Sequence, residues 1–205
     1  ERFLANRGID IGDFMHAKRF GYERDSKIFL EYHLPAEKAG EILNSTNGYF
    51  WRNRWFKPKN KEEVKVYYST RGELRTYIHQ IPEDAIGDSL TQSNALNAAQ
   101  FFLVGTMGID IQNWELIESK TEKLKNRWDH EFEWKERSFN IKESNHILTV
   151  KVQGDQIGYY NERIKLPETW RLEYEKIRSK NNLLSTIGFT GLFIALITVF
   201  IMILV

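Results

Sequence analysis

The pattern that comes nearest to a catalytic motif is the segment HEFEW at residues 130–134. It begins like the HExxH motif of zinc peptidases, in which two histidines four residues apart on a helix bind the metal. The second histidine would have to be residue 134, which is tryptophan. The alternation of polar and apolar residues over 130–136 also predicts a strand rather than the helix that the motif needs. The sequence therefore predicts no metal site here.

Asp129 and His130 are the residues that the sequence singles out as candidate site residues. They follow Arg127 and Trp128, and an acid next to an imidazole admits two interpretations. The favoured one is a buried Asp–His pair that braces a sheet, and the alternative is a ligand-binding role. The other histidines show no metal-ligand spacing, and no P-loop, GxGxxG or GxSxG pattern occurs. We therefore predict no catalytic, cofactor-binding or metal-binding residue in this segment.

A second stretch interleaves aromatic residues with cations, namely Trp51, Arg52, Arg54, Trp55 and Lys57. It could stack single-stranded nucleic acid or sugars, but a strand with one aromatic and one charged face gives the same pattern and is favoured. The net charge of +1, from 29 Lys and Arg against 28 Asp and Glu, argues against a nucleic-acid partner. The absence of cysteine excludes a disulfide framework and a cysteine nucleophile.

The elements that must position these residues occur as a repeat. Gly-Ile-Asp-Ile, followed by an aromatic residue, stands at 8–11 and again at 108–111. A second pair of similar segments, 62–84 and 147–169, has alternating apolar residues around a glycine turn and ends in Pro-Glu. Two matched pairs in the same order indicate duplication. We predict an α+β fold of two repeated helix-plus-antiparallel-sheet units, an N-terminally truncated one at 1–84 and another at 85–169.

Local patterns give the expected elements of each unit. Helical spacing of apolar residues predicts a helix over 89–108, with Ser89 or Thr91 as its N-cap. We expect residues 1–7 to be the C-terminal end of the equivalent helix in the first unit. Proline at its start predicts a short helix over 35–43. Hairpin turns are expected at Arg71-Gly72 and Gly154-Asp155. The expected strands are 27–33, 53–57, 64–69, 74–79, 130–136, 147–152 and 157–166.

The last 23 residues differ from the rest of the chain. Residues 183–205 carry no charge and reach about 35 Å as a helix, which is enough to cross a bilayer. We predict a transmembrane helix here, preceded by a juxtamembrane helix at 170–182, and hence the lipid bilayer as a partner. Because the chain begins without methionine and ends on Ile-Leu-Val, we expect it to be a piece of a longer membrane protein.

The arrangement of motifs resembles the N-terminal region of a subset of bacterial CPBP (CAAX-protease-like) intramembrane metalloproteases. The similar segments are 54–90, 108–137 and 150–181, with Lys165-Leu166-Pro167-Glu168 and Arg178-Ser179-Lys180-Asn181 matching the family pattern. The repeated units also resemble PepSY-type modules, which accompany secreted peptidases and membrane sensors. The family's Glu-Glu-x-x-x-Arg motif is not met, because Glu62-Glu63 is followed by Tyr67 where arginine is required.

The resemblance implies a non-catalytic, membrane-tethered domain that recognises substrate or regulates a metalloprotease. Catalysis would then belong to further membrane helices, with zinc or another divalent metal bound there and no cofactor in this segment. The implied partner is a peptide or protein substrate, and the implied location is the outer side of a bacterial inner membrane. The four cations between Arg171 and Lys180, taken alone, favour a cytoplasmic domain instead. The alternative function is an extracytoplasmic sensor or binding domain of a signalling or adaptor protein.

Overall fold

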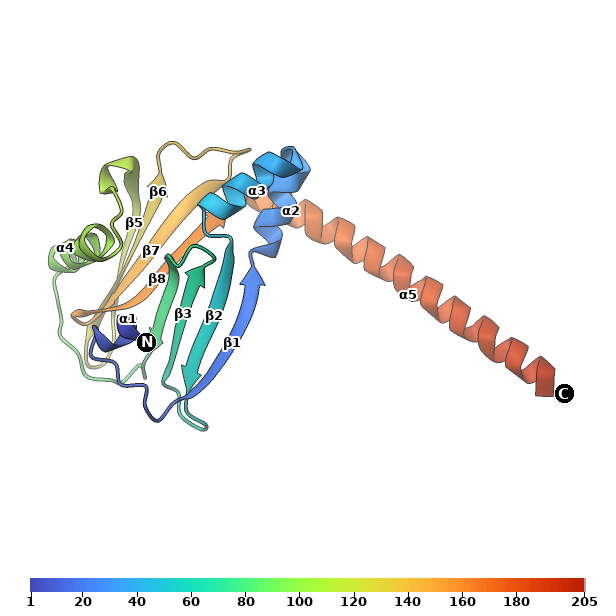
Figure 1. Ribbon diagram of the computed structural model, residues 1–205, viewed down its shortest axis with the longest axis horizontal. Coiled ribbons are helices and arrows are strands. Elements are labelled where there is room, and N and C mark those ends of the chain that lie inside the picture. The colour runs from blue at the N-terminus through green and yellow to red at the C-terminus, as the bar shows by residue number, and fades with distance from the viewer. Residues whose placement is uncertain (205) are drawn as a thin grey trace. The chain divides into compact units, whose positions relative to one another are not determined.

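The computed structural model describes residues 1–204, and the side chains of residues 1–203. Residues Glu1–Lys165 form one compact unit, and the chain from Leu166 forms a second. The first unit is α+β, as predicted: helices pack against a single antiparallel sheet (Figure 1).

The sheet has eight strands in the order β1-β2-β3-β4-β8-β7-β6-β5. Each half of the chain supplies four consecutive antiparallel strands, and β4 pairs with β8 to join the halves. The predicted boundary at residues 84 and 85 falls between β4 and the next helix. The strands are β1 (Met15–Tyr22), β2 (Tyr49–Phe56), β3 (Glu63–Ser69), β4 (Leu74–Gln80), β5 (Trp114–Lys123), β6 (Trp128–Glu136), β7 (Asn145–Gln153) and β8 (Gln156–Lys165).

Side-chain alternation gives the sheet one apolar and one polar face. In β7, Leu148, Val150 and Val152 join the main hydrophobic core, whereas Thr149 and Lys151 point to the opposite face. The core also takes Trp134 from β6 and Tyr160 from β8, both almost fully buried. The register pairs Trp134 with Leu148 and Val150 with Tyr160, so the core side chains of neighbouring strands lie side by side.

Helix α4 (Gln92–Phe101) covers the apolar face and continues into a π-helical turn, Phe102–Thr106. Thr91 caps it through the backbone N–H of Asn94, as predicted. Ala95 and Ala99 are fully buried, and these small side chains let the helix lie close to β6 and β7. Helix α1 (Arg2–Ala5), which precedes β1, contributes Leu4 to the same core.

The segment 27–33, predicted to be a strand, is helical. It belongs to α2 (Arg24–His33), which contacts α3 (Ala36–Ser45), the helix predicted after Pro35. Its buried residues are Ser26, Phe29 and Leu30, and their spacing of three and four fits a helix. The apolar run in this segment is too short to distinguish a helix from a strand by sequence alone. The strands β1 and β5 were not predicted, because they form the sheet edges, stay largely exposed and lack an apolar face.

The two predicted hairpin turns are present. Gly72 lies between β3 and β4 with φ of 85°, and Gly154 lies between β7 and β8 with φ of 65°. This left-handed region favours glycine at both positions.

The second unit contains one helix, α5 (Glu168–Leu204), which runs without a break through the predicted juxtamembrane and transmembrane segments. It is long and apolar enough to cross a membrane, and none of its most apolar stretch is buried against the rest of the chain. An exposed, uncharged run of this length is a candidate membrane span.

Candidate functional site

The two residues singled out from the sequence do not form the expected pair. Asp129 and His130 are neighbours in β6, so their side chains point to opposite faces of the sheet. The buried His130 ring contacts the Thr121 hydroxyl at 2.9 Å and the Leu90 carbonyl at 2.9 Å. Asp129 accepts hydrogen bonds from Arg127, at 2.8 and 3.2 Å, and from the Gly154 N–H.

Arg127 explains the structural role of this region. Its guanidinium also donates to the carbonyls of Pro82 and Ala85, in the segment that joins the two halves of the chain. The Arg127–Asp129 pair therefore fixes the connection to the sheet.

The aromatic–cationic stretch is a strand with two different faces, as favoured from the sequence. The register of β2 places Trp55 opposite Val64 on the core side, and Arg54 opposite Lys65 on the other face. Arg54 forms an ion pair with the buried Glu63 at the start of β3.

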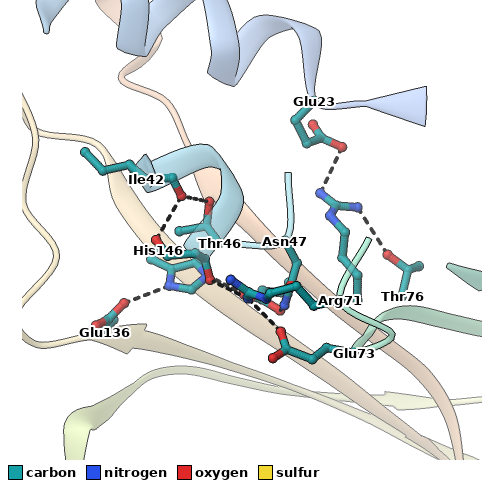
Figure 2. A network of polar contacts seen from close by, with 12 residues as sticks. Glu23, Ile42, Thr46, Asn47, Arg71, Glu73, Thr76, Glu136 and His146 are labelled. Carbon is teal, nitrogen blue, oxygen red and sulfur yellow. Dashed lines mark hydrogen bonds and ion pairs between the residues drawn. The ribbon is translucent and has the colours of Figure 1, made fainter. Parts of the chain in front are cut away.

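A different set of residues forms a buried polar site on the core face of the sheet. The imidazole of His146, at the start of β7, lies between two carboxylates, with Nδ1 at 2.7 Å from Glu136 and Nε2 at 2.9 Å from Glu162 (Figure 2). Neighbouring strands supply the three residues, since β6 and β8 flank β7. His146 and Glu162 are 5% and 7% exposed, so water cannot solvate the charges and the pairing must do so.

A second layer of residues holds this triad. Asn47 ends α3 in the left-handed conformation, with φ of 54°, and its amide donates to Glu162 at 2.8 Å. Arg71, in the β3–β4 turn, donates to the Asn47 side-chain oxygen at 3.1 Å and to Glu73 at 2.7 Å. Figure 2 shows these side chains converging on the space beside the end of α3.

The histidine of this triad is positively charged at neutral pH. Burial lowers the pKa of His146, but the hydrogen bonds and charges of Glu136 and Glu162 outweigh burial and raise the pKa to about 8. The pKa of Glu136 is correspondingly lowered by its hydrogen bond from His146. Because ionised carboxylates only accept hydrogen bonds, both ring nitrogens must carry protons.

The two carboxylates of the triad, Glu136 and Glu162, lie in the wall of a cavity of about 710 Å³. Trp114, Leu148 and Tyr160 give this cavity an apolar wall, and four carboxylates give it an acidic one: Glu73, Asp110, Glu136 and Glu162. A smaller cavity of about 420 Å³ shares Trp114 and Glu136 and reaches the His146 ring from another side. Trp114 is thus placed between the two, with its ring 5.1 Å from that of His146.

The arrangement suits recognition of a cation better than acid–base catalysis. Both nitrogens of His146 are already bound to carboxylates, so the ring has no lone pair with which to accept a proton. The nearby Ser138 hydroxyl donates to Glu136 and not to His146, and the lowered pKa of Glu136 makes that carboxylate a weak base. The four carboxylates of the cavity carry four negative charges, and two cations are bound to them: Arg71 to Glu73, and protonated His146 to Glu136 and Glu162. The net charge of the site is therefore about −2 at neutral pH.

Sequence reasoning missed this triad because its members come from three strands. A signal was present nonetheless: His146 shares the apolar parity of Leu148 and Val150 in β7, and Glu162 shares that of Tyr160 in β8. An ionisable residue on the buried face of a strand needs a partner, and this rule would have drawn attention to both.

Comparisons with protein-family models, with curated proteins and with solved structures found no match. The function must therefore be argued from the site itself.

Proposed function

We propose that this chain is a non-catalytic recognition domain anchored to a membrane by α5, and that its acidic cavity binds a ligand with a cationic group. The observation that carries the proposal is the Glu136–His146–Glu162 triad. Both nitrogens of its imidazole are bound to carboxylates, and these carboxylates face a cavity. A lysine or arginine side chain of a peptide combines the charge and the apolar stem that such a cavity accommodates.

The proposal extends to the protein of which this chain is a part. A recognition domain beside a membrane suits the expectation of a CAAX-protease-like metalloprotease, whose catalytic metal would lie in further membrane helices and whose substrate this domain would select. It suits a membrane sensor or adaptor as well. The coding sequence after Val205 separates the two: further spans with Glu-Glu-x-x-x-Arg support the protease, and a soluble signalling domain contradicts it.

We also propose that the two halves of the sheet unit are repeats. Each half runs from a helix through a Gly-Ile-Asp-Ile loop into four antiparallel strands. Gly8 and Gly108, which open the two loops, have nearly the same left-handed φ of 69° and 67°. In this interpretation the acidic cavity is a specialisation that both halves build, since Glu73 comes from the first half and Asp110, Glu136 and Glu162 from the second.

The binding proposal is tested with a matched pair of small probes. The full chain in lipid nanodiscs is titrated with N-acetyl-arginine amide and with its neutral analogue N-acetyl-citrulline amide, and tryptophan fluorescence reports on Trp114. We expect the arginine probe to bind more tightly, and Glu73→Gln to weaken it by about tenfold through the loss of one carboxylate. The control Glu115→Gln removes the same charge from the edge strand β5 and should leave binding unchanged. Equal binding of both probes would contradict the proposal.

The anchoring proposal is tested separately by flotation of the full chain with liposomes. We expect the protein to float and to resist extraction by alkaline carbonate, as an inserted helix does. Recovery in the soluble fraction would show that α5 does not insert.

A further inference from the structure

A second group of carboxylates lies on the opposite, polar face of the sheet. Glu118 in β5 and Glu131 and Glu133 in β6 each present an oxygen, and these three oxygens lie within 4.8 Å of one another. Glu118 stands directly opposite Glu133 in the register of the two strands. Like charges in such a position destabilise a sheet unless a cation lies between them.

Glu133 adds an independent observation. Its side chain is only 6% exposed, yet its Oε2 atom has no hydrogen-bond partner. The other oxygen, Oε1, accepts from Arg163 at 2.6 Å and from the Thr149 hydroxyl at 3.2 Å. Lys165 Nζ forms an ion pair with Oε2 at 3.7 Å, which is too long for a hydrogen bond. A buried carboxylate oxygen without a donor is costly and calls for a ligand.

The lysines around the cluster are replaceable. Lys120 pairs with Glu118 and Lys151 pairs with Glu131, and these two lysine side chains are 60% and 43% exposed. Exposed ion pairs of this kind contribute about 1 kcal/mol or less, so a multivalent cation can displace them at small cost. With Lys120 and Lys151 turned to solvent, the three carboxylates outweigh Arg163 and Lys165 by about one negative charge, which favours binding of a cation.

We propose that Glu118, Glu131 and Glu133 form a binding site for a calcium ion. Carboxylate oxygens are the ligands that hard divalent cations prefer. Calcium tolerates irregular coordination, whereas magnesium demands near-ideal octahedral geometry; side chains fixed to two strands of a sheet cannot rearrange to supply it. The remaining coordination positions belong to water. With three protein ligands, the affinity expected is that of weak extracellular modules, a Kd of about 0.1–1 mM.

The test is isothermal titration of Ca²⁺ into the full chain in nanodiscs of zwitterionic lipid, which bind little calcium themselves. We expect saturable binding, weakened by about tenfold or more in the double variant Glu118→Gln, Glu131→Gln. Glu133 is left intact because it also holds Arg163. The matched control is Glu115→Gln with Glu122→Gln, which removes two charges from β5 outside the cluster and should leave binding unchanged.

The lysines provide a second test that a merely structural cluster would not pass. Lys151→Gln removes a competing ammonium group and should tighten Ca²⁺ binding several-fold, whereas the control Lys123→Gln should have no such effect. Absence of saturable binding up to about 10 mM, a concentration well above the expected Kd, would overturn the proposal. So would equal affinity in the double variant and the unaltered chain. Tighter binding of Mg²⁺ than of Ca²⁺ would overturn the choice of ion.

Discussion

The His146 triad makes the stability of the sheet unit depend on pH in a defined direction. The folded pKa of His146 is about 8, above its ordinary value of 6.5, so the folded state binds the proton more tightly than the unfolded state does. The resulting stabilisation is fully present below about pH 6.5 and is lost as pH rises through 8. Glu136 acts in the opposite sense: its pKa is lowered, so its contribution is lost only in acid.

The size of the effect follows from the shift. A rise of about 1.5 units at about 1.4 kcal/mol per unit gives about 2 kcal/mol. His146 is well buried, so solvent screening reduces this value little. We expect the free energy of unfolding to fall by about 2 kcal/mol between about pH 5.5 and about pH 9. The interval ends below the range in which the buried tyrosines ionise, since burial raises the pKa values of Tyr77 and Tyr160 above 10.

The assay is urea unfolding of the full chain in detergent micelles, followed by tryptophan fluorescence at a series of pH values. His146→Gln should abolish the fall in stability between the two pH limits, because glutamine does not titrate. The matched control is His130→Gln, which removes another buried histidine whose ring contacts a hydroxyl and a carbonyl rather than carboxylates. It should lower stability at every pH and keep the slope.

Two results would refute this reasoning. If the unaltered chain gains stability from about pH 5.5 to about pH 9, the imidazole is not held as a cation in the folded state. If His146→Gln and His130→Gln both keep the pH dependence, the proton belongs to another group.

Three further predictions concern the rest of the chain. Glu23→Gln should destabilise the fold by about 3 kcal/mol in urea unfolding, because the buried guanidinium of Arg75 loses its ion pair with Glu23 at 2.8 Å and keeps only the charge of Glu162; a loss below about 1 kcal/mol would mean that water or Glu162 compensates Arg75. Gly154→Ala should cost more than Gly72→Ala in the same assay, since both have positive φ but a Cβ on Gly154 would also lie 3.0 Å from a backbone nitrogen. About 1–2 kcal/mol is expected for the conformation alone, and equal losses would refute the contact. Ile194→Arg should make insertion of α5 less favourable by about 3 kcal/mol in a translocon insertion assay, and an unchanged inserted fraction would argue that this residue does not lie in the hydrocarbon core.

The fold was predictable where local patterns and burial agree. Interior strands carry apolar residues at every second position, as Leu148, Val150 and Val152 do in β7, and the turns at Gly72 and Gly154 have the positive φ that favours glycine. The errors lie where burial is weak or the segment is short. β1 is exposed along nearly its whole length and has no apolar face to predict it, and α2 is too short to separate from a strand by its apolar run.

The candidate site was predictable in part only. Its members are 10 and 16 residues from His146 along the chain, and the register that brings them together depends on long-range pairing of β6, β7 and β8. Sequence adjacency favoured Asp129 with His130, but neighbours in a strand point apart. Residues of like parity in adjacent strands are the ones that meet, which only the sheet order reveals.

The central claim is that His146 is a charged bridge between two carboxylates, which makes the cavity a recognition site rather than a catalytic one. The most direct test is the ¹⁵N chemical shifts of its two ring nitrogens, measured from about pH 5 to about pH 10. We predict that both nitrogens are protonated at neutral pH and that the ring titrates with a midpoint of about 8. A ring that is neutral at pH 7, with one unprotonated nitrogen, would contradict the claim, because it would leave His146 a free lone pair with which to act as a general base.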